Sequence, residues 1–194
     1  MKKIGILGLT IAFITMSFVA PTAPVKEVFT VDTANSTLTW KGYKPTGSHN
    51  GNIMLQSGSI VIKDDKIAAG SFVVDMSTIK DVDGSARLEG HLKSADFFEI
   101  EVYTTSKFEI VKTHHKEGKS HITGNLTIKD VTKEITFEAT TVVDGDTVIL
   151  TSELLKVNRA EFNIKYKSKS FFNDLKEKFI EDEFDLQVTI VAKK

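Results

Sequence analysis

The feature that most constrains the fold is an alternation of apolar and polar residues with a period of two, which recurs along most of the chain. Leu38 and Trp40, for example, alternate with Thr37, Thr39 and Lys41. Because successive side chains of a β-strand point to opposite faces, this alternation is typical of a sheet with one buried face. It recurs in segments 37–41, 71–76, 107–110, 122–128, 134–139 and 184–192. The chain is therefore predicted to be all-β.

The connections between these segments are short and rich in turn-forming residues. Asp144-Gly145 separates two alternating runs and suits the positive φ angles of a tight hairpin. Residues 63–66 and 115–118 separate further pairs of strands. Strands joined by such short links must run antiparallel, since a parallel partner needs a crossover of about a dozen residues or more. The sequence predicts an up-and-down meander of about eight strands, which either closes into a barrel or folds into a sandwich.

Two segments show helical spacing instead of alternation. In residues 85–94, Leu88 and Leu92 lie four positions apart, as on one face of a short helix. Residues 170–181 contain an apolar stripe at helical spacing, formed by Phe171, Phe172, Leu175 and Phe179. Each segment is predicted to form a short helix that plugs or covers the sheet.

The N-terminal segment has the composition of an export signal. Lys2 and Lys3 form a basic head, and residues 4–20 carry no charge. Prolines and small residues follow at 20–24, which is typical of a secretory signal peptide. A retained membrane anchor is the alternative, because an uncharged run of this length is close to the ~17–25 residues that span a bilayer. We expect residues 1–23 to be a signal peptide and 24–194 one domain, periplasmic or secreted.

Composition and motifs argue against several classes of function. Lys and Arg total 25 against 26 Asp and Glu, so the chain lacks the concentrated basic surface that a nucleic-acid binder needs. The absence of cysteine excludes disulfides, thiolate metal sites and cysteine nucleophiles. The five histidines lack metal-ligand spacing: His49, His91, His114, His115 and His121. No nucleophile elbow, Walker motif or dinucleotide-binding motif occurs. We expect no enzyme activity, no metal and no cofactor.

The 13 phenylalanines leave one structural question open. Core packing is their ordinary role, yet several cluster, at 97–98 and 171–172 and at Phe162 near Tyr166. A barrel of about eight strands is either filled by its own side chains or holds one ligand in its mouth. Composition does not distinguish these alternatives.

Three blocks of sequence occur in a recognisable order. Residues 90–99 read GHLKSADFFE, residues 124–133 read GNLTIKDVTK and residues 157–162 read VNRAEF. These blocks resemble the H-L-K-S-x-D-F-F-D/E, G-x-L-T-(I/L)-x-G-V-T-K and (I/V)-(N/D)-R-x-(D/E)-(F/W) motifs of the YceI-like family of periplasmic polyisoprenoid-binding proteins. The resemblance extends over about residues 27–193. Two features depart from it: the Arg-Asp pair that many members carry before His91 is missing, and Asp130 replaces a glycine.

The resemblance implies a lipocalin-like, extended antiparallel barrel with one or two short helices and an isoprenoid or other long-chain lipid inside. Such a ligand gains about 0.8 kcal/mol per buried CH₂ and needs no catalytic group. The expected lining comprises Trp40, Phe72, Phe108, Phe137 and Phe162. The entrance is expected at Leu88, Phe97 and Phe98, with His91 beside it, anchoring its helix by a hydrogen bond.

Two rival functions stay open at this point. One is a filled-core secreted β-protein with an interaction or stress role and no lipid ligand. The other is an enzyme that acts on a lipid with His91 or His49 as base. Phenylalanines exposed at the barrel end would be compatible with a homodimer and with transient membrane contact.

Overall fold

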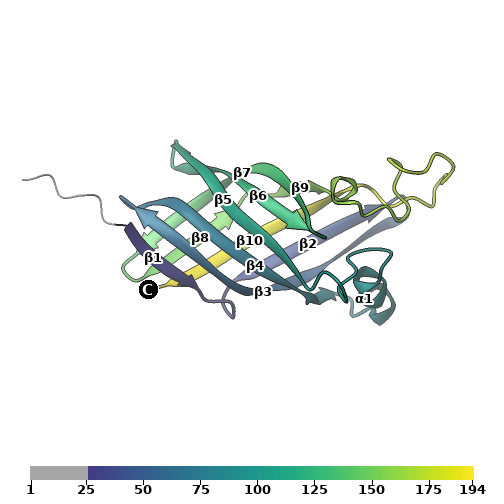
Figure 1. Cartoon of the computed structure of the whole chain (residues 1–194), viewed down its shortest axis with the longest axis horizontal. Coiled ribbons are helices and arrows are strands. Elements are labelled where there is room, and N and C mark those ends of the chain that lie inside the picture. The colour runs from purple at the N-terminus through teal and green to yellow at the C-terminus, as the bar shows by residue number, and fades with distance from the viewer. Residues whose placement is uncertain (1–25) are drawn as a thin grey trace, which may run out of the picture.

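The computed structural model describes residues 26–194, which form ten strands, one α-helix and one 3₁₀ helix (Figure 1). The elements are β1 Lys26–Val31, β2 Thr37–Lys44, β3 Gly47–Lys63, β4 Lys66–Asp81, α1 Ala86–Lys93, β5 Thr105–Lys116, β6 Lys119–Ile128, β7 Val131–Asp144, β8 Thr147–Ser152, β9 Leu155–Asn158, η1 Arg159–Phe162 and β10 Glu183–Lys193. The predicted signal peptide at 1–23 lies outside the described residues.

All strands belong to one antiparallel sheet that closes on itself. Each strand from β2 to β7 pairs with its successor along the chain. Strand β10 closes the ring by pairing with both β8 and β2. Two strands extend this ring lengthwise: β1 lies between β3 and β10 beyond the end of β2, and β9 pairs with β10 beyond the end of β8. The ring therefore has eight strand positions, which confirms the prediction of an all-β, extended antiparallel barrel.

Tight turns hold neighbouring strands in register. Asp64 and Asp65 between β3 and β4 both have positive φ, at 51° and 57°. Lys129 and Asp130 between β6 and β7 also have positive φ, at 50° and 56°. Two consecutive positive φ values match the twist that a two-residue hairpin requires. Asp130 thus adopts the conformation that the family's glycine would favour.

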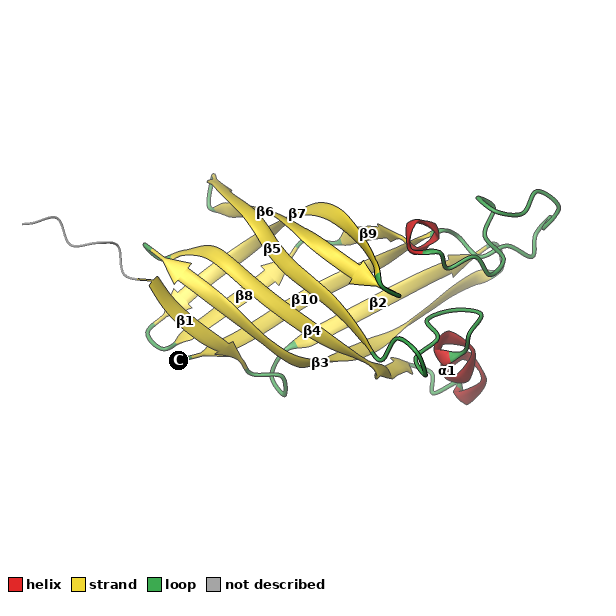
Figure 2. Cartoon of the chain, viewed as in Figure 1, coloured by secondary structure: helices red, strands yellow, loops and turns green. Residues whose placement is uncertain are grey.

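The barrel differs at its two ends (Figure 2). At the end that carries β1 and the C-terminus, the interior is filled by side chains that are almost wholly buried: Phe29, Ile60, Ile67, Val148 and Ile190. The other end carries α1, η1 and the loops of residues 163–182. Among residues 26–194, no helix has the length and apolar character needed to span a bilayer.

The structure confirms one predicted helix and contradicts the other. Residues 86–93 form α1, whose first turn is capped by the hydroxyl of Ser85, which accepts from the backbone N–H of Leu88 at 3.3 Å. Residues 170–181, by contrast, form turns rather than a helix. Lys176 takes a positive φ of 50° in the middle of this segment, and Phe171 and Phe172 remain exposed. Half of the apolar stripe therefore lies against no partner, and packing supplies most of a short helix's stability.

Candidate functional site

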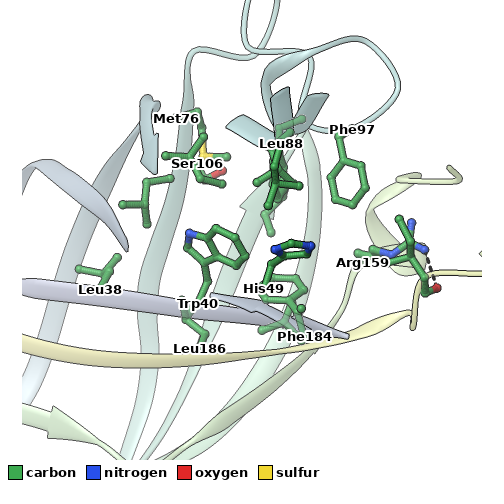
Figure 3. Close-up of a pocket in the computed structure, with 18 of the residues that line it drawn as sticks. Leu38, Trp40, His49, Met76, Leu88, Phe97, Ser106, Arg159, Phe184 and Leu186 are labelled. Carbon is green, nitrogen blue, oxygen red and sulfur yellow. Dashed lines mark hydrogen bonds between the residues drawn. The ribbon is translucent and has the colours of Figure 1, made fainter. Parts of the chain in front are cut away.

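The helical end of the barrel encloses an apolar cavity of about 180 Å³. Its walls come from strands β2 to β6, β9 and β10, and α1 covers it (Figure 3). Leu38 and Trp40 on β2 face Met76 on β4, while Phe184 and Leu186 of β10 lie alongside them. Most of the lining side chains are apolar, so the cavity suits a hydrocarbon better than a polar ligand.

Trp40 owes its position to a glycine on the neighbouring strand. Trp40 on β2 pairs directly with Gly51 on β3. A Cβ added at Gly51 would lie 2.8 Å from the Trp40 ring and 1.7 Å from the carbonyl oxygen of Lys80, so only glycine fits. The buried indole Nε1 has no hydrogen-bond partner among the described residues.

The corner between β4 and α1 is fixed by hydrogen bonds to acidic side chains. The buried carboxylate of Asp81 accepts from the backbone N–H of Ser85 at 3.1 Å. Glu89 accepts from Lys80 at 2.8 Å and from the backbone N–H of Asp81 at 3.2 Å. The hydrogen bond from Lys80 holds the pKa of Glu89 below its ordinary value. These contacts place Leu88 over the cavity.

His91 borders the cavity but holds its helix differently from the prediction. Its ring packs edge-on against Tyr166, with centroids 4.4 Å apart, and against Phe97 at 5.8 Å. Its Nε2 atom is buried without a hydrogen-bond partner among residues 26–194, 3.7 Å from an Asp96 oxygen. The expected hydrogen bond is therefore replaced by aromatic packing.

Arg159 is a buried cation at the edge of the cavity, and the sequence analysis assigned it no role. Its side chain is 2% exposed and donates to the backbone oxygens of Glu181, Ile164 and Ile180 at 2.9–3.1 Å. Burial lowers the pKa of the guanidinium, while Asp182, 3.4 Å away, counteracts that shift. Arg159 also stacks over the Phe97 ring. Its place in the VNRAEF block is the one sequence signal that pointed to this arginine.

Five of the nine predicted site residues lie together in the lining: Trp40, Leu88, His91, Phe97 and Phe98. The structure places Phe72, Phe108, Phe137 and Phe162 outside it. Phe162 is 1% exposed in η1. The other three form an aromatic stack, with ring centroids 6.4 Å apart for Phe72–Phe108 and 5.5 Å for Phe108–Phe137.

The aromatic stack lies just beyond the cavity. Phe72 precedes the lining residue Val74 by two positions on β4, and Phe108 pairs with the lining residue Leu126. A Cβ at Gly124 would lie 2.4 Å from the Phe108 ring, so this glycine makes room for it. The interior is therefore neither wholly filled nor wholly hollow.

Polar groups gather at the rim of the cavity. The Tyr43 hydroxyl donates to Asp185, which also accepts from Lys156 at 3.1 Å. The Asp185 contact raises the pKa of Tyr43. His49 Nδ1 lies 3.8 Å from Asp81. Inside the cavity, the hydroxyl of Ser106 donates to the Met76 sulfur.

The residues that sequence reasoning missed share one property. Met76, Ser106, Phe184 and Leu186 all line the cavity. Phe184 and Leu186 belong to the terminal alternating run, and Leu186 pairs with Trp40 across β10 and β2. The alternation marked them as inward-facing but carried no sign of which inward positions border empty space. Among residues 26–194, no three His, Asp or Glu side chains gather in a way that could hold a metal.

Comparisons with known proteins agree with the observed fold. The family model of the YceI-like domain matches residues 29–192. A UPF0312 protein of Pseudomonas aeruginosa strain LESB58 is 30% identical over 89 residues, which cover 46% of this chain and 47% of that protein. One from Pseudomonas putida strain W619 is 37% identical over 78 residues, 39% of this chain and 40% of that protein. The matched region is thus less than half the length of these curated relatives.

Three solved structures share the fold at low sequence identity. BcnA of Burkholderia cenocepacia superposes with a TM-score of 0.69 at 21% identity, over 84% of this chain and 99% of its own. A polyisoprenoid binding domain from Saccharophagus degradans, implicated in plant cell wall breakdown, gives 0.64 at 11% identity, over 85% and 97%. The Campylobacter jejuni YCEI protein gives 0.55 at 17% identity, over 100% and 99%.

Proposed function

The chain belongs to the YceI-like domain family, and we propose that it is an exported binding protein for a polyisoprenoid or similar long-chain amphiphilic lipid. The observation that carries the proposal is the apolar cavity beneath α1, walled by Trp40, Met76 and Leu186. The polyisoprenoid binding domain among the structural neighbours supports it. Transfer of hydrocarbon from water into such a cavity is favourable by about 0.8 kcal/mol per CH₂.

The volume of the cavity limits how a long chain would be held. About 180 Å³ is below the ~300–1,000 Å³ typical of small-molecule pockets. We propose that the inner part of the lipid tail fills this space and that the rest extends through the rim or displaces the stacked rings of Phe72, Phe108 and Phe137. The protein's contribution is burial and exclusion of water, with no chemical step.

Purified protein tests this directly. Native mass spectrometry followed by solvent extraction should reveal a bound amphiphile. Trp40 is the only tryptophan of the chain and lines the cavity, so its fluorescence should change when added farnesol binds to lipid-stripped protein.

A matched pair of variants locates the lipid. Val74→Phe replaces a small aliphatic side chain of the cavity wall with an aromatic ring and should abolish lipid recovery. Val142→Phe adds the same ring at a position 57% exposed and should leave it unchanged. Equal lipid in both variants would place the ligand elsewhere. The filled-core alternative would be favoured if the wild type is recovered without lipid and if added farnesol does not change its Trp40 fluorescence.

A further inference from the structure

Two adjacent phenylalanines are exposed at the helical end of the barrel. Phe171 is 41% exposed and Phe172 is 46% exposed. They belong to the loops of residues 163–182, which extend from the same end as α1 (Figure 1). Val82 and Val102, which flank α1 along the chain, are also exposed. Two adjacent aromatic side chains that are both exposed mark a candidate interaction surface.

The exposure of these rings is imposed by the fold. The buried Ser168 accepts, through its backbone oxygen, from the N–H groups of Phe171 at 3.2 Å and Phe172 at 3.0 Å. The Ser170 hydroxyl donates to Asp182 at 2.6 Å, and Asp182 lies 3.4 Å from the buried Arg159. The turn formed by residues 168–172 is therefore tied to the barrel, with its two rings turned toward solvent.

The chain just before this turn is basic. Residues 163–173 contain three lysines and no acidic residue. Lys165 lies over the Phe171 ring, with its Nζ 5.2 Å from the centroid. Neither Lys165 nor Lys167 forms an ion pair within residues 26–194, whereas Lys169 pairs with Glu181 at 3.4 Å. Unpaired lysines beside exposed aromatic rings suit an anionic lipid surface, where the ring enters the interface and the ammonium meets the headgroups.

The same segment also borders the cavity. Ile180 and Glu181 belong to its lining, and the Ile180 N–H donates to the backbone oxygen of Lys167 at 2.9 Å. The basic, aromatic surface is therefore continuous with the rim through which a lipid would pass.

We propose that residues 165–172 form a docking surface for an anionic lipid bilayer. Docking would bring the cavity rim to the membrane, so that an apolar chain could pass between the two with little exposure to water. This docking does not depend on which ligand the cavity holds.

Vesicle flotation tests the proposal without reference to the cavity ligand. Protein from cells that make the full chain is mixed with vesicles of phosphatidylethanolamine and phosphatidylglycerol, or of phosphatidylcholine alone. The wild type should float with the anionic vesicles, less so at high salt, and bind phosphatidylcholine weakly. The double variant Phe171→Ser/Phe172→Ser should bind the anionic vesicles at least about tenfold more weakly.

A control variant removes apolar surface from the opposite end of the barrel. Val28→Ser/Val142→Ser changes two side chains that are 62% and 57% exposed and should bind like the wild type. Lys165→Gln/Lys167→Gln should remove most of the salt dependence while keeping the fold, checked by thermal unfolding. All variants share the same N-terminal segment, so differences between them report the docking surface.

Three results would overturn the proposal. The first is failure of the wild type to bind anionic vesicles. The second is equal loss of binding in the phenylalanine and valine double variants. The third is a dimer in sedimentation velocity that Phe171→Ser/Phe172→Ser dissociates, which would assign the surface to a second copy of the chain. Lipid in the cavity is measured separately by solvent extraction, so each of these results would count against the docking surface and not against the proposed lipid binding.

Discussion

At the scale of single residues, Arg159 joins the loops of residues 163–182 to the barrel. Its guanidinium donates to three backbone carbonyls, and its Asp182 partner is only 15% exposed. A planar group with five N–H donors can satisfy such a set, whereas an ammonium cannot match its fork geometry. Arg159 therefore organises one wall of the cavity without contacting bulk solvent.

Replacing this residue should be costly. Arg159→Met leaves three backbone carbonyls without their donor and removes the cation 3.4 Å from Asp182, so the free energy of unfolding should fall by about 3–5 kcal/mol. Urea denaturation measures the change. Arg87 is the only other arginine and is exposed on α1, so Arg87→Met serves as the control and should change the unfolding free energy by less than about 0.5 kcal/mol. Equal effects would contradict the structural role of Arg159.

The lowered pKa of Asp185 predicts that the stability of the fold depends on pH. Burial alone would raise its pKa, but hydrogen bonds from Tyr43 and Lys156 outweigh burial and hold the pKa below 3.8. The carboxylate therefore stabilises the folded state above pH 3.8, and this stabilisation is lost as the pH falls through the lower folded-state pKa. Asp185→Asn should lower the unfolding free energy at neutral pH, and its difference from the wild type should shrink in acid.

Denaturant titrations at several pH values measure this difference. Asp174→Asn, at an exposed position, is the control and should follow the wild-type curve throughout. A deficit in Asp185→Asn that persists unchanged in strong acid would show that the lost packing, rather than the lost charge, is responsible.

At the scale of the elements, the pairing of β3 with β2 and β4 depends on Gly51. This residue pairs with Trp40 on one side and Asp81 on the other, and a Cβ there would collide with the Lys80 carbonyl at 1.7 Å. A collision with backbone cannot be relieved by a rotamer change, so the two strands would have to separate. Gly51 thus determines how closely the wall behind Trp40 is packed.

A single methyl group tests this. Gly51→Ala should reduce the free energy of unfolding by about 1–3 kcal/mol or more and shift the emission of Trp40. Gly42, on β2 near the rim, has no heavy atom within 4 Å of an added Cβ, so Gly42→Ala should be neutral or slightly stabilising. Thermal unfolding and fluorescence of the two variants together give the result. Equal stability would mean that β3 has room to move.

At the scale of the whole molecule, export stays a prediction from the sequence. Lys2, Lys3 and the uncharged run of residues 4–20 predict cleavage between about Ala20 and Pro24. N-terminal sequencing of protein recovered from the extracytoplasmic fraction should find a chain that begins in that interval. An intact Met1 in the membrane fraction would instead support the retained anchor.

The sequence by itself determined the class of the fold, because strand alternation and two-residue turns are local properties. Leu38 and Trp40 alternate with polar neighbours whatever the rest of the chain does, and Asp64-Asp65 can adopt positive φ values within a few residues. The motif blocks at 90–99, 124–133 and 157–162 likewise carried the family resemblance without any tertiary information.

Only the tertiary structure decided what each inward side chain borders. Alternation separates inside from outside but does not encode position along the barrel, so Phe184 and Phe108 looked equivalent although one lines the cavity and the other packs in the aromatic stack. Residues 170–181 show the same limit, because helical spacing does not reveal whether a partner surface exists. The burial of Arg159 depends on carbonyls up to 22 positions away along the chain. These features arise from contacts between distant segments, which no local pattern records.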